Sequence, residues 1–263
     1  MRRITFTADD FGLTSSVNEA VERAHRAGAL HAASLMVAAP AAADAVRRAH
    51  ALPTLEVGLH LVVIEGPSVL PPSRIPDLVD GNGQFPTDQL RLGLNYFARP
   101  HIRRQLADEI RAQFAAFAAT GLKLAHADAH KHMHLHPTVG RLMLDIGREF
   151  GLSRVRIPTE SPAILARCGT NTGLGGHALY HWSRLLRSQV RSANMTTTDH
   201  CFGIAWSGHM TRDRLARLMV ELPEGTSEIY FHPAAERDAT LRSLMPDYEH
   251  EMELAALLAL APC

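Results

Sequence analysis

Residues 4–28, ITFTADDFGLTSSVNEAVERAHRAG, contain a short apolar run followed directly by a helical pattern. Residues 4–8 predict a strand, and Thr14 or Ser15 can cap the helix that follows. Gly28 ends this helix, whose apolar face is formed by Val17, Ala20, Val21 and Ala24. A strand followed by a helix is the repeating unit of parallel α/β folds.

The same alternation recurs along the chain. Further strands are predicted at residues 33–39, 55–61, 154–158, 196–202 and 228–232, and helices end near residues 50, 121 and 151. A histidine-rich strand begins near His126, with Asp128 and His130 near its end and with His134 and His136 beyond it or below a bound metal ion. No internal repeat is evident. Because strand–helix units of this number favour a closed parallel sheet, we expect an α/β fold of the (β/α) barrel type, TIM-like, irregular or seven-stranded.

Length and composition favour a single domain. The chain has 263 residues, of which 46% are hydrophobic, and this is enough for one large core. Two segments interrupt the pattern, at about 65–100 and about 161–192, and both are rich in glycine or proline. We therefore predict one domain over residues 1–263 with two long loop insertions, the places where barrels usually handle substrate.

Charge and cysteine content exclude several classes of protein. Twenty-seven basic residues balance twenty-seven acidic ones, so no overall field favours nucleic acid. Cys168, Cys201 and Cys263 form no C-x-x-C pair, which argues against a disulfide framework and a thiolate zinc site. The first residues are neither a signal peptide nor a transmembrane helix, and we expect a cytoplasmic protein.

Residues 126–137, HADAHKHMHLHP, place histidines and one aspartate on alternate positions. In a regular strand alternate residues project from the same face, so several imidazoles and a carboxylate would point to one place, with Lys131 facing away. This arrangement favours a metal site. The alternative is that the histidines only reflect biased composition, or that they bind metal ions without a function.

Polar residues also follow other predicted strands. Asp9 and Asp10 end the first strand, His60 ends the third, and His232 ends the last. In parallel barrels the carboxyl ends of the strands form the active-site face. The pattern predicts one polar pocket, in which one of the paired aspartates binds a metal and the other reaches the water on that metal.

Four motifs together resemble the YdjC/ChbG-like carbohydrate deacetylases. They are Thr7-Ala-Asp9-Asp10-Phe-Gly12, Gly58-Leu-His60-Leu, the histidine-rich run from His126 to His134, and Phe231-His232-Pro233. Residues 156–160, 197–200 and 228–234 are more similar to the hopanoid-biosynthesis-associated branch, HpnK. Ala234 stands where many members have glycine, and Lys131 where many have histidine.

The resemblance implies a set of functional residues. Asp10, His60 and His130 would be the ligands of one divalent metal ion, Asp9 the general base and His232 the general acid. Zinc is the first expectation, with manganese, cobalt, nickel, iron and magnesium as alternatives. Four further residues are candidates for orienting ligands, contacting substrate or forming ordinary structural bonds or a surface ion pair: Asp128, His126, His132 and Arg156.

The implied reaction is metal-dependent hydrolysis of the N-acetyl group of an N-acetylglucosamine-containing glycoconjugate. An N-acetylglucosaminyl hopanoid lipid is the first expected substrate, and a chito-oligosaccharide is the alternative. A non-haem iron oxygenase and a non-enzymatic metal-binding protein are the rival classes. Apolar side chains in the first insertion could contact a lipid, form a lid or join two copies, which leaves peripheral membrane contact and a homodimer open: Phe85, Leu92, Leu94, Tyr96 and Phe97.

Overall fold

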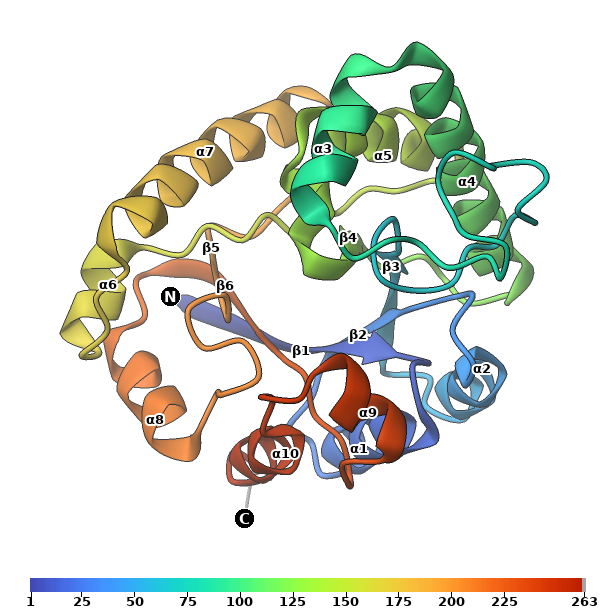
Figure 1. Cartoon of the computed structure of the whole chain (residues 1–263). Coiled ribbons are helices and arrows are strands. Elements are labelled where there is room, and N and C mark those ends of the chain that lie inside the picture. Colours follow the sequence, from blue (N-terminus) through green and yellow to red (C-terminus); the bar gives the residue numbers. More distant parts are fainter. Residues whose placement is uncertain (262–263) are drawn as a thin grey trace.

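The computed structural model describes residues 1–261, so Cys263 lies outside the described residues. Within that range a parallel sheet of six strands, ordered β4-β3-β2-β1-β6-β5, curls into a half-barrel with helices around it (Figure 1). The strands are β1 (Arg2–Phe11), β2 (Ala32–Leu35), β3 (Glu56–Leu61), β4 (Ala127–Ala129), β5 (His200–Phe202) and β6 (Gly225–Phe231).

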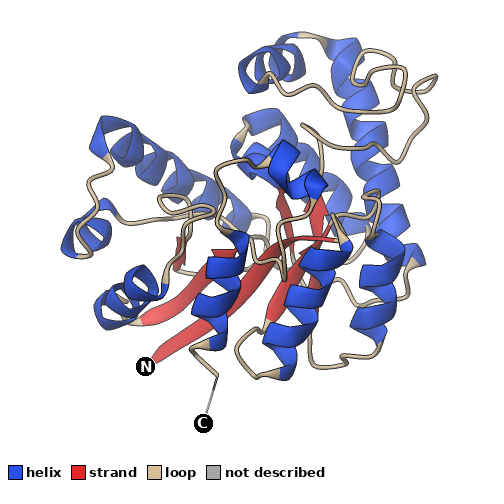
Figure 2. Ribbon diagram, turned by 60° about the horizontal axis from the view of Figure 1, so that its bottom comes forward, coloured by secondary structure: helices blue, strands red, loops and turns tan. Residues whose placement is uncertain are grey.

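Helices follow most of the strands and cover the sheet (Figure 2). They are α1 (Ser15–Arg26), α2 (Ala42–His50), α3 (Gln89–Ala98), α4 (Pro100–Ala119), α5 (Pro137–Glu149), α6 (Pro162–Arg167), α7 (Gly173–Ser192), α8 (Arg212–Glu221), α9 (Ala239–Leu244) and α10 (His250–Leu258), with a 3₁₀ segment η1 (His130–Leu135). In the part of the chain that the structure describes, none of these helices has the length and apolarity that a membrane crossing requires.

The first strand–helix unit is formed as predicted. The Thr14 hydroxyl accepts a hydrogen bond from the Val17 amide, which caps α1. β1 lies in the middle of the sheet and pairs with β6 from Arg2 to Ala8. Its Ala8 and Phe11 are fully buried in the apolar cluster that joins the sheet to the helices.

The expected closed barrel is not formed by strand ladders among residues 1–261. Beyond β4 the pairing continues only through isolated parallel bridges, Ala127 with Val155 and Arg154 with Thr196. Pro158 has no amide hydrogen, which helps to end the predicted strand at 154–158 early. The observed fold is an open half-barrel consistent with a TIM-like barrel, and seven strands are not confirmed. The single domain over 1–263 stays a prediction.

The expectation that the histidine-rich segment stays a regular strand at Lys131 and His132 is wrong. β4 ends at Ala129, and Lys131 and His132 adopt left-handed backbone angles, with φ of 50° and 52°. This turn breaks the alternation, so the later histidines do not share one strand face with His130. The tract from His126 to His136 is therefore divided between a short strand and a 3₁₀ turn.

The two predicted insertions differ from each other. Residues 62–88 form the expected loop, and α3 follows it. The segment 161–192 is mostly helical, contrary to the expectation of a loop. Ser183, Leu186 and Val190 bury one face of α7, and this helical spacing outweighs the glycines at its start.

Gly58 in β3 leaves room for a buried imidazole, and its replacement tests this packing. A Cβ atom there would lie 2.5 Å from the His126 ring, whereas a Cβ at Gly81 would meet nothing within 4 Å. We expect Gly58→Ala to lower the free energy of unfolding by about 1–3 kcal/mol. Urea denaturation with Gly81→Ala as the control measures it, and equal stability of the two variants would contradict the packing.

Candidate active site

A cavity of about 550 Å³ opens where β1, β3, β4 and β6 end. The predicted residues Asp9, Asp10, His60, His130 and His232 all line it. Its remaining wall comes from loops and from α9, and much of that wall is apolar, including Leu13, Met36, Phe85, Ile204, Leu244 and Met245. The cavity therefore has charged and imidazole side chains at the strand ends and a largely apolar wall elsewhere.

Asp10 lies at an irregularity of β1 that aims its carboxylate at two imidazoles. The register with β2 shifts between Ala8 and Phe11, and Asp10 has a left-handed φ of 58°. One carboxylate oxygen, Oδ1, lies 3.4 Å from His60 Nε2 and 3.2 Å from His130 Nδ1. Strain at this backbone position accompanies the convergence of three side chains.

These three side chains fit a divalent cation. Their donor atoms lie within 4.8 Å of one another, and neither buried Asp10 oxygen has a hydrogen-bond partner among residues 1–261. A buried carboxylate without such partners is costly unless a cation compensates it. Two imidazoles and one carboxylate also leave coordination positions free for water and substrate, as catalytic zinc sites do.

Asp128 orients His60. The two residues are register partners in β3 and β4, and His60 Nδ1 donates to Asp128 Oδ1 over 2.7 Å. The other oxygen accepts a hydrogen bond of 2.8 Å from the Ser34 hydroxyl. This leaves His60 Nε2 directed toward Asp10, an arrangement that fixes the ring of many metal-bound histidines.

The charges around His60 are strongly negative. Burial lowers the pKa of His60, but Asp128 and Asp10 outweigh burial and raise it to about 10. Burial likewise acts to raise the pKa of Asp10, yet the His130 and His60 imidazoles hold it well below the ordinary value. Both pKa shifts show that positive charge between these carboxylates is stabilised. A bound cation would supply that charge in place of the proton on His60.

Arg156 corrects one expectation from the sequence. Its side chain is fully buried, so it neither reaches the cavity nor forms a surface ion pair. Its guanidinium lies 2.7 Å from Asp9 Oδ2, 2.8 Å from Asp128 Oδ2 and 2.8 Å from Glu228 Oε1. The Tyr230 ring packs against it at 4.8 Å. Arg156 is thus the shared cation of three buried carboxylates inside the half-barrel.

Asp9 lies between this network and the cavity. Burial raises the pKa of its carboxyl to about 6, although the neighbouring Arg156 acts to lower it. Its Oδ1 has no hydrogen-bond partner in the described part of the chain. A carboxylate with a pKa close to neutral and a free oxygen has the properties of a general base.

His232 is held by α10 through its backbone. Its amide donates to the Glu253 carboxylate, and its carbonyl oxygen accepts a hydrogen bond of 2.7 Å from His250 Nδ1. The ring lies edge-on to Tyr248, with centroids 5.2 Å apart. Burial lowers the His232 pKa to about 4, so the imidazole is neutral at pH 7 in the absence of substrate.

Other residues of the histidine-rich tract have different surroundings. His126 is buried and does not line the cavity, and its Nε2 lies 3.0 Å from the Ser34 hydroxyl. His132 lines the cavity, and its Nε2 lies 2.8 Å from the Tyr230 hydroxyl. Lys131 was expected to face away, but the left-handed turn brings it to the cavity wall, where it pairs with Glu65.

Sequence reasoning missed several residues that position the site. Glu228 had a detectable signal, because it is the only charged residue in an otherwise uncharged buried strand and such a charge requires a partner. Ser34, Tyr230 and Glu253 had no comparable signal, since their contacts arise from strands and helices far apart in the sequence.

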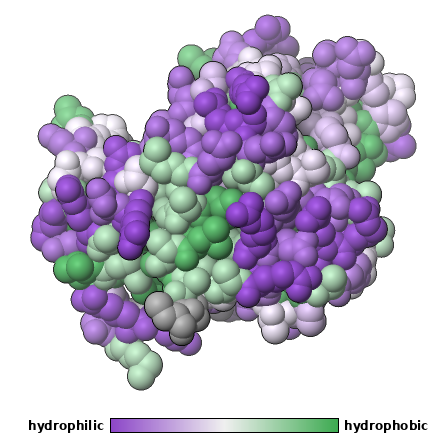
Figure 3. All heavy atoms as spheres, turned by 90° about the horizontal axis from the view of Figure 1, so that it is seen from below, coloured by the Kyte–Doolittle hydropathy of each residue, from purple (hydrophilic) through white to green (hydrophobic). Residues whose placement is uncertain are grey.

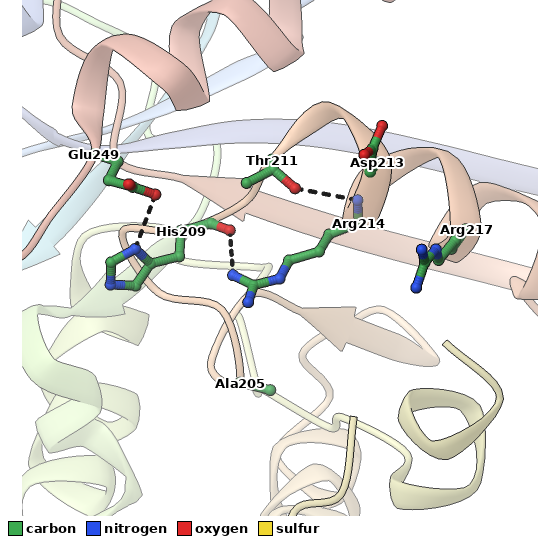
Figure 4. A pocket seen from close by; sticks show the side chains of 7 residues that line it. All are labelled: Ala205, His209, Thr211, Asp213, Arg214, Arg217 and Glu249. Carbon is green, nitrogen blue, oxygen red and sulfur yellow. Dashed lines mark hydrogen bonds and ion pairs between the residues drawn. The ribbon is translucent and has the colours of Figure 1, made fainter. Parts of the chain in front are cut away.

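A second depression, of about 540 Å³, lies on the surface near α8 (Figure 4). Its polar groups contact one another: His209 lies 3.1 Å from Glu249, and Arg214 donates to the His209 carbonyl oxygen over 2.7 Å. Among the described residues that line this depression, no group matches the cluster of Asp10, His60 and His130.

Replacement of Arg156 tests the buried network. In Arg156→Gln three buried carboxylates lose their cation, and we expect the free energy of unfolding to fall by about 3–5 kcal/mol. The surface pair of Arg111 with Glu149 provides the control, because Arg111→Gln removes an exposed ion pair and should change stability little. Urea denaturation compares the two, and a loss in Arg156→Gln no larger than in the control would contradict this interpretation.

Comparison with known proteins identifies the family. A carbohydrate deacetylase of Vibrio vulnificus is 31% identical over 97% of this chain and 87% of its own length. One from Brevibacillus brevis is 36% identical over 61% of this chain and 59% of its own length, and one from Geobacillus stearothermophilus is 31% identical over 86% and 77%.

A solved structure supports the same fold. A candidate cellobiose-phosphate cleavage protein of Enterococcus faecalis superimposes with a TM-score of 0.72 and 22% identity, over 98% of this chain and 90% of that one. The family model for YdjC-like proteins matches residues 3–261. The chain therefore belongs to the YdjC-like protein family.

Proposed function

We propose that this protein is a carbohydrate deacetylase that hydrolyses the N-acetyl group of an amino sugar and depends on a divalent metal ion. The observation that carries the proposal is the cluster of Asp10, His60 and His130, with Asp9 beside it in one cavity. The carbohydrate deacetylases among its relatives support the reaction class. Asp10, His60 and His130 would hold the ion.

The donor set favours zinc, with manganese, cobalt, nickel, iron or magnesium as alternatives, because imidazole ligands suit transition metals. When bound, such an ion supplies a Lewis acid that polarises the acetyl carbonyl and lowers the pKa of water. Asp128 would keep the His60 ring in position for this role through its 2.7 Å hydrogen bond.

Asp9 and His232 would carry the proton transfers. Asp9 takes a proton from water as the water oxygen bonds to the acetyl carbon. The bond between this carbon and the nitrogen then breaks, and His232 donates a proton to the leaving amine. Because His232 is neutral in the resting site, the proton that Asp9 takes from water must pass to His232 before His232 donates it to the leaving amine. Water then loses one proton, the nitrogen gains one, and Asp9 and His232 both return to their starting states.

For the substrate, we propose an N-acetylglucosaminyl hopanoid lipid, with a chito-oligosaccharide as the alternative. The aliphatic side of the cavity, with Leu13, Met36 and Ile204, supports an apolar group next to the amino sugar. A cytoplasmic location is part of the same proposal.

Replacement of Asp9 tests the chemistry. Asp9→Asn keeps the shape of the side chain but cannot accept the proton, so we expect acetate release to fall about 10²–10⁴-fold. Acetate is measured with both substrates, with and without a chelator, and Asp213→Asn on the exposed start of α8 is the control. Normal turnover by Asp9→Asn would refute this mechanism, and consumption of dioxygen instead of acetate release would support the oxygenase.

Metal binding is tested separately from turnover. We expect about one zinc ion per chain, with affinity lowered at least about tenfold in Asp10→Asn and retained in Asp9→Asn. Isothermal titration with zinc and elemental analysis of the purified variants measure both. Zinc affinity unchanged in Asp10→Asn would show that the ligand set is wrong. Metal binding without acetate release from either substrate would favour the non-enzymatic alternative.

A further inference from the structure

Helix α3 exposes a stripe of large apolar side chains. Leu90, Leu94 and Phe97 are 76%, 63% and 64% exposed. Their spacing places them on one face of the helix. The opposite face is buried through Leu92 and Tyr96, and the Tyr96 hydroxyl donates to the Val63 carbonyl oxygen over 2.7 Å. The helix is therefore firmly seated, and the exposed stripe does not result from loose packing.

Positive charge lies beside this stripe. Arg91 and Arg99 line a shallow depression of about 480 Å³ together with Leu90 and Leu94. Arg103 and Arg104 are exposed at the start of α4, and the four arginines form no ion pair with the residues at positions 1–261. Residues 89–104 contain no acidic residue, and Asp88 at the edge caps α3 by accepting from the Arg91 amide over 3.0 Å.

The apolar and cationic surface adjoins the cavity. Gln84, Phe85 and Thr87, which line the cavity, immediately precede α3 in the chain. In Figure 1, α3 lies on the side of the molecule away from α8 and α10. Whatever binds α3 would thus lie close to the cavity wall.

We propose that α3 docks on an anionic membrane surface. Leucine and phenylalanine on one side of a helix with arginines beside them can enter the lipid interface while the guanidinium groups contact lipid phosphates. The chain as a whole has no net charge, so the attraction would be confined to this surface. The proposal concerns binding alone and does not depend on the deacetylase activity.

Charge and area disfavour two other occupants. A symmetric dimer through α3 would bring the same patch of two copies together, and the arginines would repel one another. Three side chains also cover far less than the roughly 800 Å² per partner of a standard protein interface. Nucleic acid would satisfy the arginines but would leave the leucines and Phe97 without an apolar partner.

Vesicle sedimentation tests the proposal. The full-length protein is mixed with vesicles of phosphatidylcholine alone or of equal parts phosphatidylcholine and phosphatidylglycerol, without sugar substrate. We expect binding to the anionic vesicles only, weakened by salt. The triple variant Leu90→Ser, Leu94→Ser, Phe97→Ser and the double variant Arg91→Gln, Arg99→Gln should each bind about tenfold more weakly or worse.

The matched control carries Val220→Ser and Met252→Ser, which remove exposed apolar side chains of α8 and α10. Figure 3 shows the molecule from below the view of Figure 1, and hydrophobic residues gather near the middle of that face, so a control with exposed apolar residues outside α3 is informative. Circular dichroism verifies that all variants are folded. No binding by the parent protein, equal binding to both vesicle types, equal loss in the control, or a dimer in size-exclusion chromatography that the triple variant abolishes would overturn the proposal.

Discussion

The site depends on one buried guanidinium shared by three carboxylates. Arg156 contacts Asp9, Asp128 and Glu228 inside the half-barrel, where none of the four side chains is hydrated as it would be at the surface. Burial of charges is costly, and an arrangement of this kind persists only when nearly every hydrogen-bonding position is satisfied. Three carboxylates against one guanidinium still leave excess negative charge, which draws positive charge toward the strand ends.

This constraint extends to the cavity through a chain of contacts. Arg156 and Ser34 hold Asp128, Asp128 holds the His60 ring, and His60 faces Asp10. The same guanidinium restrains Asp9 and limits how far burial raises its pKa. The buried ion-pair network inside the half-barrel thus positions the side chains of the cavity. The excess negative charge of this network lies at the carboxyl ends of the strands, where the cavity opens.

Residue patterns predicted part of this arrangement and failed where long-range contacts decide the structure. The convergence of Asp10, His60 and His130 could be expected, because parallel strands bring their carboxyl ends to one edge. The turn at Lys131 and His132 could not be expected, because left-handed angles at non-glycine residues are set by surrounding structure. Arg156 was expected to contact the substrate or to form a surface ion pair, because its actual partners come from three strands, β1, β4 and β6, that are far apart in the sequence. The helix α7 was hidden by glycines that lie only near its start.

In our proposal Asp10, His60 and His130 form one metal site supported by the Arg156 network. A crystal structure of the zinc-loaded protein, with data at the zinc absorption edge, locates the ion. We expect one anomalous peak bound by Asp10, His60 and His130, with Asp128 on the far side of the His60 ring. A peak held by the neighbouring group of Asp9, His60 and Asp128, or by the later histidines of the tract, would contradict it.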